Sequence, residues 1–420
     1  MACGGEYATS AGAAARIDIL SSRPVPDVPS FGHPMLDHWS LDPDVIYLNH
    51  GTVGAPPRRV LAAQQAIRDE IERQPARFLL RELSAITVGE PRTAQPRMRA
   101  AADQVAAFLG ARGDDLVFVD NATTGVNAVL RSFPFGEGDE ILIGDHAYGA
   151  IANATAFHAK ERGARVHTVE LPDPSRGDAA FVECVVRAVG PRTRLAIVDH
   201  VTSESALVLP IAEIVARCRR QGVAVLIDGA HAPGALSIDL PALGADWYVG
   251  NLHKWAYAPR SCAFLWAAAG RQESLHPLVI SWGLGQGFAA EFDWVGTKDP
   301  TAYLAAPEGI AFMRELGIVA VRSYNHRLAW EGAALLSARL RTSFRVEETM
   351  VGTMATVPLP ERMGSNREDA ARLRDALLFR DRIEVQIHAW RGRLWARFST
   401  QIYNEIADVE RLATAIAARV

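Results

Sequence analysis

Seven short, almost continuously apolar segments alternate with helical patterns between residues 116 and 266. Runs of this kind are typical of strands buried on both faces of a parallel sheet. The segments are residues 116–119, 140–143, 165–169, 195–198, 223–227, 247–249 and 262–266. Helical patterns at residues 124–132, 147–162, 179–189 and 211–221 fill most of the intervals between them. The pattern predicts an α/β fold with a large domain built on a seven-stranded, mostly parallel sheet covered by helices.

The segments on either side predict further elements. Helical patterns run over residues 58–73 and 97–109, ahead of the first strand. After Pro307 helices dominate to about residue 341, short strands follow at 353–357 and 393–399, and a last helix covers 406–419. We therefore expect an N-terminal extension (1–30), a large domain (31–305) and a smaller C-terminal α/β domain (306–420). Residues 31–58 form a segment able to pack with the small domain.

Composition limits the class of protein. The chain has 420 residues, of which 49% are hydrophobic and 22% charged, as expected for a soluble enzyme. Its net charge of −4 argues against a partner such as nucleic acid or an anionic membrane. The four cysteines share no metal-ligand spacing and are typical of reduced thiols in a cytoplasmic protein. We find no signal peptide and no apolar run of the roughly 20 residues that a membrane span needs.

Asp228 and Lys254 are the residues that most clearly indicate chemistry. Asp228 ends one apolar segment, and Lys254 lies just beyond the next. A pyridoxal 5'-phosphate (PLP) enzyme needs this pair: the lysine forms a Schiff base with the aldehyde, and the acid keeps the pyridine nitrogen protonated. Taken singly, each has an ordinary alternative, a helix N-cap for the aspartate and an exposed loop position for the lysine.

Other polar residues also follow strand ends, where ligands bind in open α/β sheets. Asn121, Thr123 and Thr124 open a helix whose free N–H groups would donate hydrogen bonds to a phosphate, although an ordinary N-cap explains these residues equally well. His253 would donate to the same phosphate. His146, in a loop after another strand, would stack on the pyridine ring unless it is simply exposed.

Two more residues would bind the substrate side of the site. His231 would reach the phenolic oxygen of the ring or the substrate. Arg397 lies within an apolar run, where its guanidinium needs an anion. A substrate carboxylate suits it, and an ion pair in the core is the alternative.

These residues occur in motifs that resemble the class V aminotransferase family of PLP enzymes, with the aspartate aminotransferase-like fold. Within it the chain is similar to the isopenicillin N epimerase-like subgroup, from about Phe31 onward. The motifs, in chain order, are YLNHG at 47–51, NATT at 121–124, DGAHAPG at 228–234, HKW at 253–255, WVGTKD at 294–299 and RFSTQIYN at 397–404.

The resemblance implies roles for individual residues. It makes Lys254 and Asp228 the lysine and aspartate of the cofactor site, and His146 the stacking histidine. Phosphate-binding positions are Thr123, Thr124 and His253. Gly296 and Thr297 form a loop that reaches the phosphate of the neighbouring subunit, which implies a homodimer with shared active sites. Asn49 and His50 line the substrate pocket, and Arg397 binds the carboxylate.

Two departures from the family pattern bear on the reaction. Many relatives carry an asparagine that bonds the ring oxygen after the fourth strand, where this chain offers the hydroxyl groups of Thr202 and Ser203. Cysteine desulfurases carry a nucleophilic cysteine in the second domain, and residues 263–420 contain none. Persulfide-forming desulfuration is therefore not expected, although β-elimination of a C–S bond needs no such cysteine.

The subgroup favours epimerisation at the Cα of an amino acid or amino-acid-derived substrate. A C–S lyase or an aminotransferase is the alternative. Epimerisation needs a second acid, for which His50, His231 and Tyr148 are candidates. A metallohydrolase is a distant alternative, because no histidine pair has the helical H-x-x-x-H spacing with a glutamate between. A nicotinamide enzyme or a non-catalytic binding protein has equally little support in the sequence.

Overall fold

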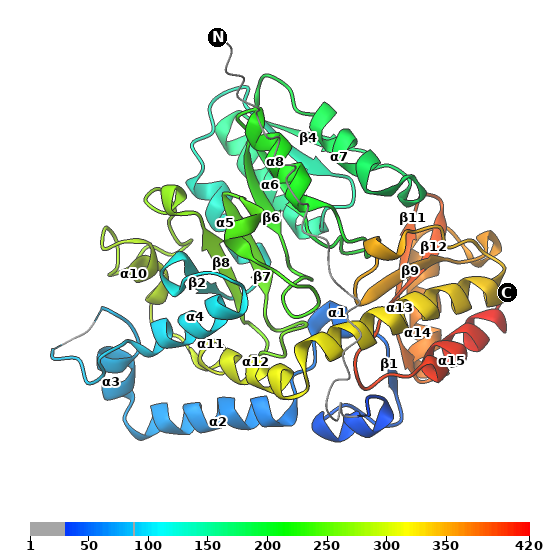
Figure 1. The fold of residues 1–420 in the computed structure, drawn as a ribbon, viewed down its shortest axis with the longest axis horizontal. Helices are drawn as coiled ribbons and strands as arrows, with labels where there is room; N and C mark the ends of the chain where they lie inside the picture. Colours follow the sequence, from blue (N-terminus) through cyan, green and yellow to red (C-terminus); the bar gives the residue numbers. More distant parts are fainter. Residues whose placement is uncertain (1–29, 87–88) are drawn as a thin grey trace, which may run out of the picture.

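The computed structural model describes residues 30–86 and 89–420 (Figure 1). Its large domain is built on a seven-stranded sheet with the order β2-β8-β7-β6-β5-β3-β4, in which only β8 runs antiparallel to its neighbours. The strands are β2 (Leu116–Val119), β3 (Glu140–Gly144), β4 (Arg165–Val169), β5 (Thr193–Asp199), β6 (Ala224–Asp228), β7 (Trp247–Asn251) and β8 (Ala263–Ala267). The prediction of a seven-stranded, mostly parallel sheet is confirmed.

Helices cover both faces of this sheet (Figure 1). They are α2 (Arg58–Arg73), α4 (Arg97–Phe108), α5 (Ala122–Ser132), α6 (Gly149–Arg162), α7 (Gly177–Arg187), α8 (Ile211–Arg220), α9 (Leu240–Leu243), α10 (Phe288–Asp293), α11 (Thr301–Leu304) and α12 (Ala306–Glu315). Short segments complete this part of the chain: α1 (His50–Val53) and α3 (Pro75–Arg77).

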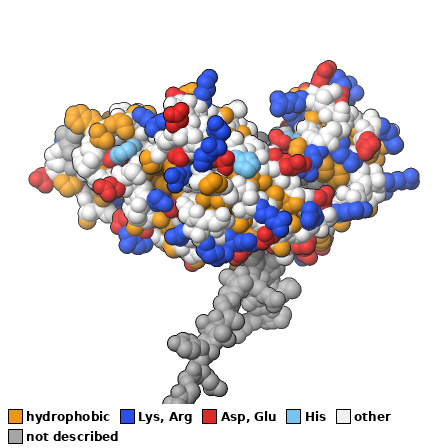
Figure 2. Space-filling model, turned by 90° about the horizontal axis from the view of Figure 1, so that it is seen from above, with side chains coloured by type: hydrophobic (Ala, Val, Ile, Leu, Met, Phe, Trp, Pro, Cys, Tyr) orange, Lys and Arg blue, Asp and Glu red, His pale blue; other side chains and the backbone are white. Residues whose placement is uncertain are grey.

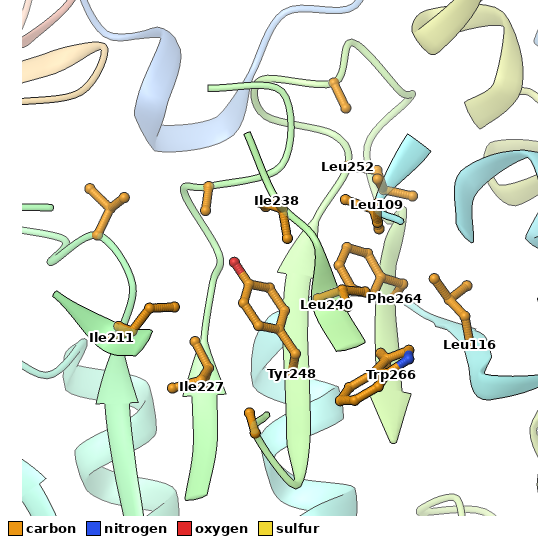
Figure 3. Packing of buried hydrophobic residues seen from close by; sticks show 14 of the residues in the cluster. Leu109, Leu116, Ile211, Ile227, Ile238, Leu240, Tyr248, Leu252, Phe264 and Trp266 are labelled. Carbon is orange, nitrogen blue, oxygen red and sulfur yellow. The ribbon is translucent and has the colours of Figure 1, made fainter. Parts of the chain in front are cut away.

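The central strands are buried on both faces because successive side chains enter two different cores. In β7, Tyr248 belongs to one apolar cluster and Val249 to the other. Tyr248 stacks on Phe264 of β8, with ring centroids 6.0 Å apart and planes 2° from parallel, and Figure 3 shows both rings within this cluster. Burial on both sides explains the continuous apolar runs in the sequence.

The small domain packs three strands against three helices. Its antiparallel sheet has the order β11-β12-β9, from β9 (Met354–Pro358), β11 (Gln386–Trp390) and β12 (Arg393–Ser399). The helices are α13 (Ile318–Leu340), α14 (Arg367–Phe379) and α15 (Ile406–Ala417). The N-terminal segment joins this domain, because β1 (Ile46–Tyr47) pairs with β10 (Ile383–Glu384) and Leu48 is in its core.

The predicted helical region 308–341 is two helices. The left-handed backbone of Gly317, at φ 81°, separates α12 from α13. Helix α12 contacts α2 and α4, whereas α13 contacts α15 and β9. We therefore propose that the boundary between the domains lies at Gly317 rather than at residue 305. The predicted extension 1–30 falls almost wholly outside the described residues.

The surface in Figure 2 carries basic and acidic side chains intermingled, with no broad field of one sign on this face. Within the part of the chain that the structure describes, no helix is long and apolar enough to cross a membrane.

Candidate active site

The chemically informative residues gather at the carboxyl ends of the central strands. Asp228 is the last residue of β6 and pairs in register with Val249 of β7. Lys254 follows three residues after the end of β7. Since parallel strands end at the same edge of the sheet, the two side chains are brought to one place.

The Lys254 amine is buried, and its Nζ lies 3.1 Å from Nε2 of His231. The pKa of Lys254 is lowered to about 7, mainly by burial and then by the positive charge of Arg397, with Asp228 acting in the opposite direction. A substantial fraction of the amine is therefore neutral near pH 7, as a nucleophile or proton acceptor must be.

Asp228 is a buried carboxylate with a single side-chain hydrogen bond described, accepted at 3.0 Å from the Ala230 N–H. Burial raises its pKa, and the Ala230 bond and Lys254 lower it. Asp199 ends β5 and pairs in register with Asp228, and burial beside that carboxylate holds the pKa of Asp199 well above its usual range. The sequence analysis did not select Asp199, although its position at a strand end was the available signal.

His231 and His146 each have a buried ring nitrogen, His231 Nδ1 and His146 Nε2, without a hydrogen-bond partner in the part of the chain that the structure describes. The carboxylate oxygen Oδ1 of Asp145 lies 3.8 Å from His146 Nε2. Burial, followed by Lys254 and Arg397, lowers the pKa of His231 well below its usual value. Burial also lowers the pKa of His146 to about 4. Both rings are therefore neutral at physiological pH.

His146 is oriented by the segment after β5. Its Nδ1 lies 2.8 Å from Ser205 Oγ, which in turn is 2.6 Å from Thr202 Oγ1. Thr202 is fully buried, and its hydroxyl oxygen accepts the Leu207 N–H at 2.8 Å. The Thr202 hydroxyl is thus engaged within its own turn. Sequence analysis placed hydroxyl chemistry in this segment but did not select Ser205.

Arg397 lies on β12 and reaches the large domain from the small one. Its Nη1 donates to the Ser203 carbonyl and its Nη2 to Thr52 Oγ1, both at 2.6 Å. Its buried Nε has no hydrogen-bond partner among the residues that the structure describes. Asn49 supports this arrangement, because its Oδ1 accepts from Thr52 and its Nδ2 donates to Glu384 at 2.7 Å. Asn49 therefore acts on Arg397 through Thr52.

His50 has a different position from the one expected. It is fully buried, its Nδ1 is 2.9 Å from the Tyr403 hydroxyl, and its Nε2 is 2.9 Å from the Lys254 carbonyl oxygen. Neither ring nitrogen is free to bind substrate or to supply a proton. We therefore propose that His50 holds the backbone that carries Lys254 rather than binding the substrate.

The start of α5 is organised by two asparagines. Asn121 caps the helix by accepting from the Thr124 N–H at 2.9 Å, and Asn251 at the end of β7 accepts from the Ala122 N–H at 2.9 Å. Gly125 lets the helix approach the sheet, since a Cβ there would lie 2.6 Å from Val249. The N-cap interpretation of Asn121 is confirmed, and Asn251 was not selected from the sequence.

The remaining predicted residues are partly or fully exposed. His253 is half-buried, with Nδ1 2.9 Å from the Cys262 carbonyl oxygen. Burial lowers its pKa to about 4. Thr123 is half-buried at the start of α5. Gly296 is half-buried and Thr297 exposed, next to Lys298, whose Nζ bonds Asp120 at 3.0 Å.

Comparison with known proteins identifies the family. The profile of the family Aminotransferase class-V matches residues 84–412. The chain belongs to the class-V aminotransferase family. It is an enzyme of this family, whose cofactor is PLP.

The chain is similar to relatives with different reactions. It is 34% identical to "Probable L-cysteine desulfhydrase, chloroplastic" of Arabidopsis thaliana, over 89% of this chain and 83% of that protein. It is 33% identical to "Isopenicillin N epimerase" of Streptomyces clavuligerus, over 90% and 96%. The cysteine desulfurase CsdA of Escherichia coli shares the fold, with a TM-score of 0.72, 19% identity, and coverage of 92% and 98%.

The side chains present fit PLP. A buried amine of lowered pKa and a buried carboxylate lie at adjacent strand ends. Three buried nitrogens, on His146, His231 and Arg397, have no hydrogen-bond partner among residues 30–86 and 89–420. Unpaired buried donors and acceptors are costly, so such a set indicates a site that receives a polar, anionic molecule.

Proposed function

We propose that this chain is a PLP-dependent enzyme that removes the Cα proton of an amino acid, with Lys254 as the base. The observation that carries the proposal is the buried Lys254 amine, whose pKa of about 7 lets it exist as a free base at neutral pH. When bound, PLP supplies an aldehyde for condensation with amines and a ring that takes up the electron pair of a broken Cα bond.

Each group of PLP would be bound by different residues of the candidate site. Asp228 would pair with the pyridine nitrogen, and His146 would lie against the ring. Thr202 and Ser203 belong to the segment beside the ring oxygen, with His231 able to reach the same atom. The phosphate would be held by the α5 N-terminus and its flanking residues, namely Asn121, Thr123, Thr124 and His253.

Arg397 would hold the substrate carboxylate through its free Nε and an adjacent Nη hydrogen. Both Nη atoms are already anchored, so the guanidinium is fixed in direction before substrate arrives. A fixed guanidinium fork favours a planar carboxylate, and its orientation sets which Cα bond is presented to Lys254.

For the fate of the substrate we favour β-elimination. Lys254 takes the Cα proton, a thiolate leaves Cβ with the electrons of its bond and is protonated, and hydrolysis gives a 2-oxo acid, ammonia and a thiol. This route needs one base. Epimerisation through two groups needs an acid on the face opposite Lys254. His50 is bonded on both nitrogens, and His231 lies beside Lys254 itself.

Epimerisation remains a second candidate because of Tyr148. Its side chain is 49% exposed, precedes α6, and interacts electrostatically with Arg397. Of the three residues predicted as a second acid, Tyr148 is the one that is neither hydrogen-bonded at every polar atom, as His50 is, nor beside the Lys254 amine, as His231 is. A relative named for epimerisation is also among the similar proteins.

One experiment tests the cofactor and the fate together. Purified protein is incubated with L-amino acids, including cysteine and cysteine conjugates, in deuterated buffer. Cα exchange, racemisation, 2-oxo acid and thiol are followed in parallel. Elimination predicts 2-oxo acid and thiol in equal amounts, and Tyr148→Phe leaves that rate unchanged. Racemisation without 2-oxo acid, abolished by Tyr148→Phe, would establish the epimerase instead.

Lys254→Ala is the matched control. Borohydride reduction should attach PLP covalently to the wild-type peptide that contains Lys254 and not to the variant. Exchange by Lys254→Ala at the wild-type rate would show that Lys254 is not the base, whatever the product.

We also propose that the enzyme is a homodimer with shared sites. Gly296 and Thr297 would meet the partner's phosphate. An exposed apolar loop supports this proposal, because a partner subunit would cover it. In this loop Val279, Trp282 and Leu284 are 56%, 79% and 56% exposed. Large exposed apolar groups in one loop are typical of an interface. Trp282→Glu should give monomers in sedimentation analysis and weaken PLP binding. A monomeric wild type would refute active sites shared between two subunits.

The cytoplasmic location stays a prediction.

A further inference from the structure

The turn between β11 and β12 is short and stiff. β11 ends at Trp390 and β12 begins at Arg393, so two residues form the loop. Both have positive φ, 47° at Arg391 and 73° at Gly392. Two-residue loops with this backbone match the twist of the strands that they join, and they hold the flanking side chains in a fixed register.

This turn of the small domain contacts the large domain beside the active site. The Trp390 ring lies 4.6 Å from the His146 ring, at 88°. Arg391 Nη2 donates to the Leu171 carbonyl oxygen at 3.2 Å and lies 3.5 Å from Asp145 Oδ2. Asp145 is itself fixed, because its Oδ1 accepts the Leu171 N–H at 2.8 Å.

Trp390 is supported on its own side as well. Its carbonyl oxygen accepts from Trp395 Nε1 at 2.8 Å, and the two indole rings lie 5.3 Å apart. The Arg391 guanidinium lies 4.4 Å from the Trp390 ring centroid. Trp390 is therefore held firmly in place. His146 has one hydrogen bond, to Ser205, and its Nε2 has no hydrogen-bond partner among the described residues, since Asp145 Oδ1 lies 3.8 Å away. The Ser205 bond alone does not define the tilt of the ring about the line from Nδ1 to Ser205 Oγ.

We propose that Trp390 is a positioning residue that sets the plane of His146 and, through it, the geometry in which PLP is held. This inference rests on the proposed PLP site. A perpendicular aromatic contact restricts ring orientation in the direction that the Ser205 bond leaves open. The small domain thus contributes to the cofactor site through Trp390 as well as to the substrate site through Arg397.

The test compares Trp390→Ala with Trp330→Ala. Trp330, also half-buried in the small domain, packs on Phe344 at 5.7 Å and 60°, so it is matched in type and burial but lies on α13. The measurements are the PLP dissociation constant from titration of the PLP-free protein, the absorbance of bound PLP against pH, and the melting temperature without PLP.

We expect Trp390→Ala to weaken PLP binding about two- to tenfold, the range of one perpendicular aromatic contact. It should also shift the pH midpoint of the absorbance. Trp390→Phe should restore both values to within about twofold, since a phenyl ring keeps the contact. Trp330→Ala should change neither. Trp390→Leu, which keeps apolar bulk without a ring, replaces the alanine variant if that variant does not fold.

Three results would overturn the inference: unchanged PLP binding and absorbance in the alanine or leucine variant, equal weakening by Trp330→Ala, or no rescue by phenylalanine. Failure of the wild type to bind PLP is a separate outcome, because it would refute the proposed cofactor site itself.

Discussion

The charges around Lys254 predict that two substitutions, at Arg397 and at Asp228, shift the pKa of its amine in opposite directions. Burial is the largest cause of its lowered pKa, Arg397 is the next, and Asp228 acts in the other direction. Replacing Arg397 by glutamine removes the repulsive charge and should raise the pKa of Lys254. Replacing Asp228 by asparagine removes the attractive charge at nearly constant volume and should lower it.

The magnitudes follow from the pKa values. A fall from 10.5 to about 7 is a difference of 3.5 units, or about 5 kcal/mol between the charged and neutral amine. Charges close to a titrating group shift its pKa by about one unit or more. We therefore expect Arg397→Gln to place the Lys254 midpoint near pH 8 and Asp228→Asn to place it near pH 6, each shift being about one unit.

Competitive labelling of the PLP-free protein measures this midpoint directly. Trace acetic anhydride is divided between Lys254 and a reference amine from pH 5 to 11, and the Lys254 peptide is quantified by mass spectrometry. Shifts of the two variants in the same direction would refute the electrostatic argument. A wild-type midpoint near 10 would refute the burial argument as well.

Three further predictions concern stability and the cofactor. Between pH 7 and 10.5 the unfolded state binds one more proton at Lys254 than the PLP-free folded state, so the wild type gains stability as pH rises through this range. Below pH 7 the folded state carries the full cost of a charged buried amine, so Lys254→Met should be the more stable protein there. The difference in free energy of unfolding between Lys254→Met and the wild type shrinks as pH rises from 7 to 10.5, and urea unfolding should show it fall by about 3 kcal/mol between pH 6 and 9. A difference that stays constant with pH would contradict the lowered pKa of Lys254. Gly54→Ala should abolish folding or PLP binding, because φ is 68° and a Cβ would lie 1.8 Å from the His253 carbonyl oxygen; wild-type melting would be incompatible with this. Asn251→Ala leaves the buried Ala122 N–H unpaired and should cost about 1–3 kcal/mol by urea unfolding and weaken PLP binding; unchanged values for both would contradict the assigned role.

The large domain was predictable because its strands are buried on both sides. Continuous apolar runs identify such strands, and all seven appear within two residues of their predicted ends. The small domain was less clear. Helix α14 and strands β10 and β11 were not predicted. In β11 only Ile387 is buried and the other four residues are half-buried. A half-exposed strand of five residues has too weak a period to be distinguished from a loop.

The candidate site likewise contains residues that could be predicted from the sequence and residues that could not. Asp228 and Lys254 were selected from the sequence because strand ends carry ligands in this class of sheet, and the topology of the sheet brings the two residues close together. Contacts between distant segments were not available from the sequence. Ser205 approaches His146 from 59 residues away, and Thr52 approaches Arg397 from 345 residues away. No local pattern encodes such pairs.

His50 illustrates why motif position does not determine chemical role. It lies in the segment expected to line the substrate pocket, yet its two nitrogens bond Tyr403 and the Lys254 carbonyl oxygen. Burial lowers its pKa to about 4, so the ring stays neutral and does not add a third positive charge beside Lys254 and Arg397. A protonated His50 would lower the pKa of Lys254 further and oppose binding of a protonated substrate amine. The same neutrality holds for His146, His231 and His253. With these histidines uncharged, Asp228 and Arg397 are the charged groups that act on Lys254. In the proposed arrangement these two residues face the cofactor ring and the substrate carboxylate.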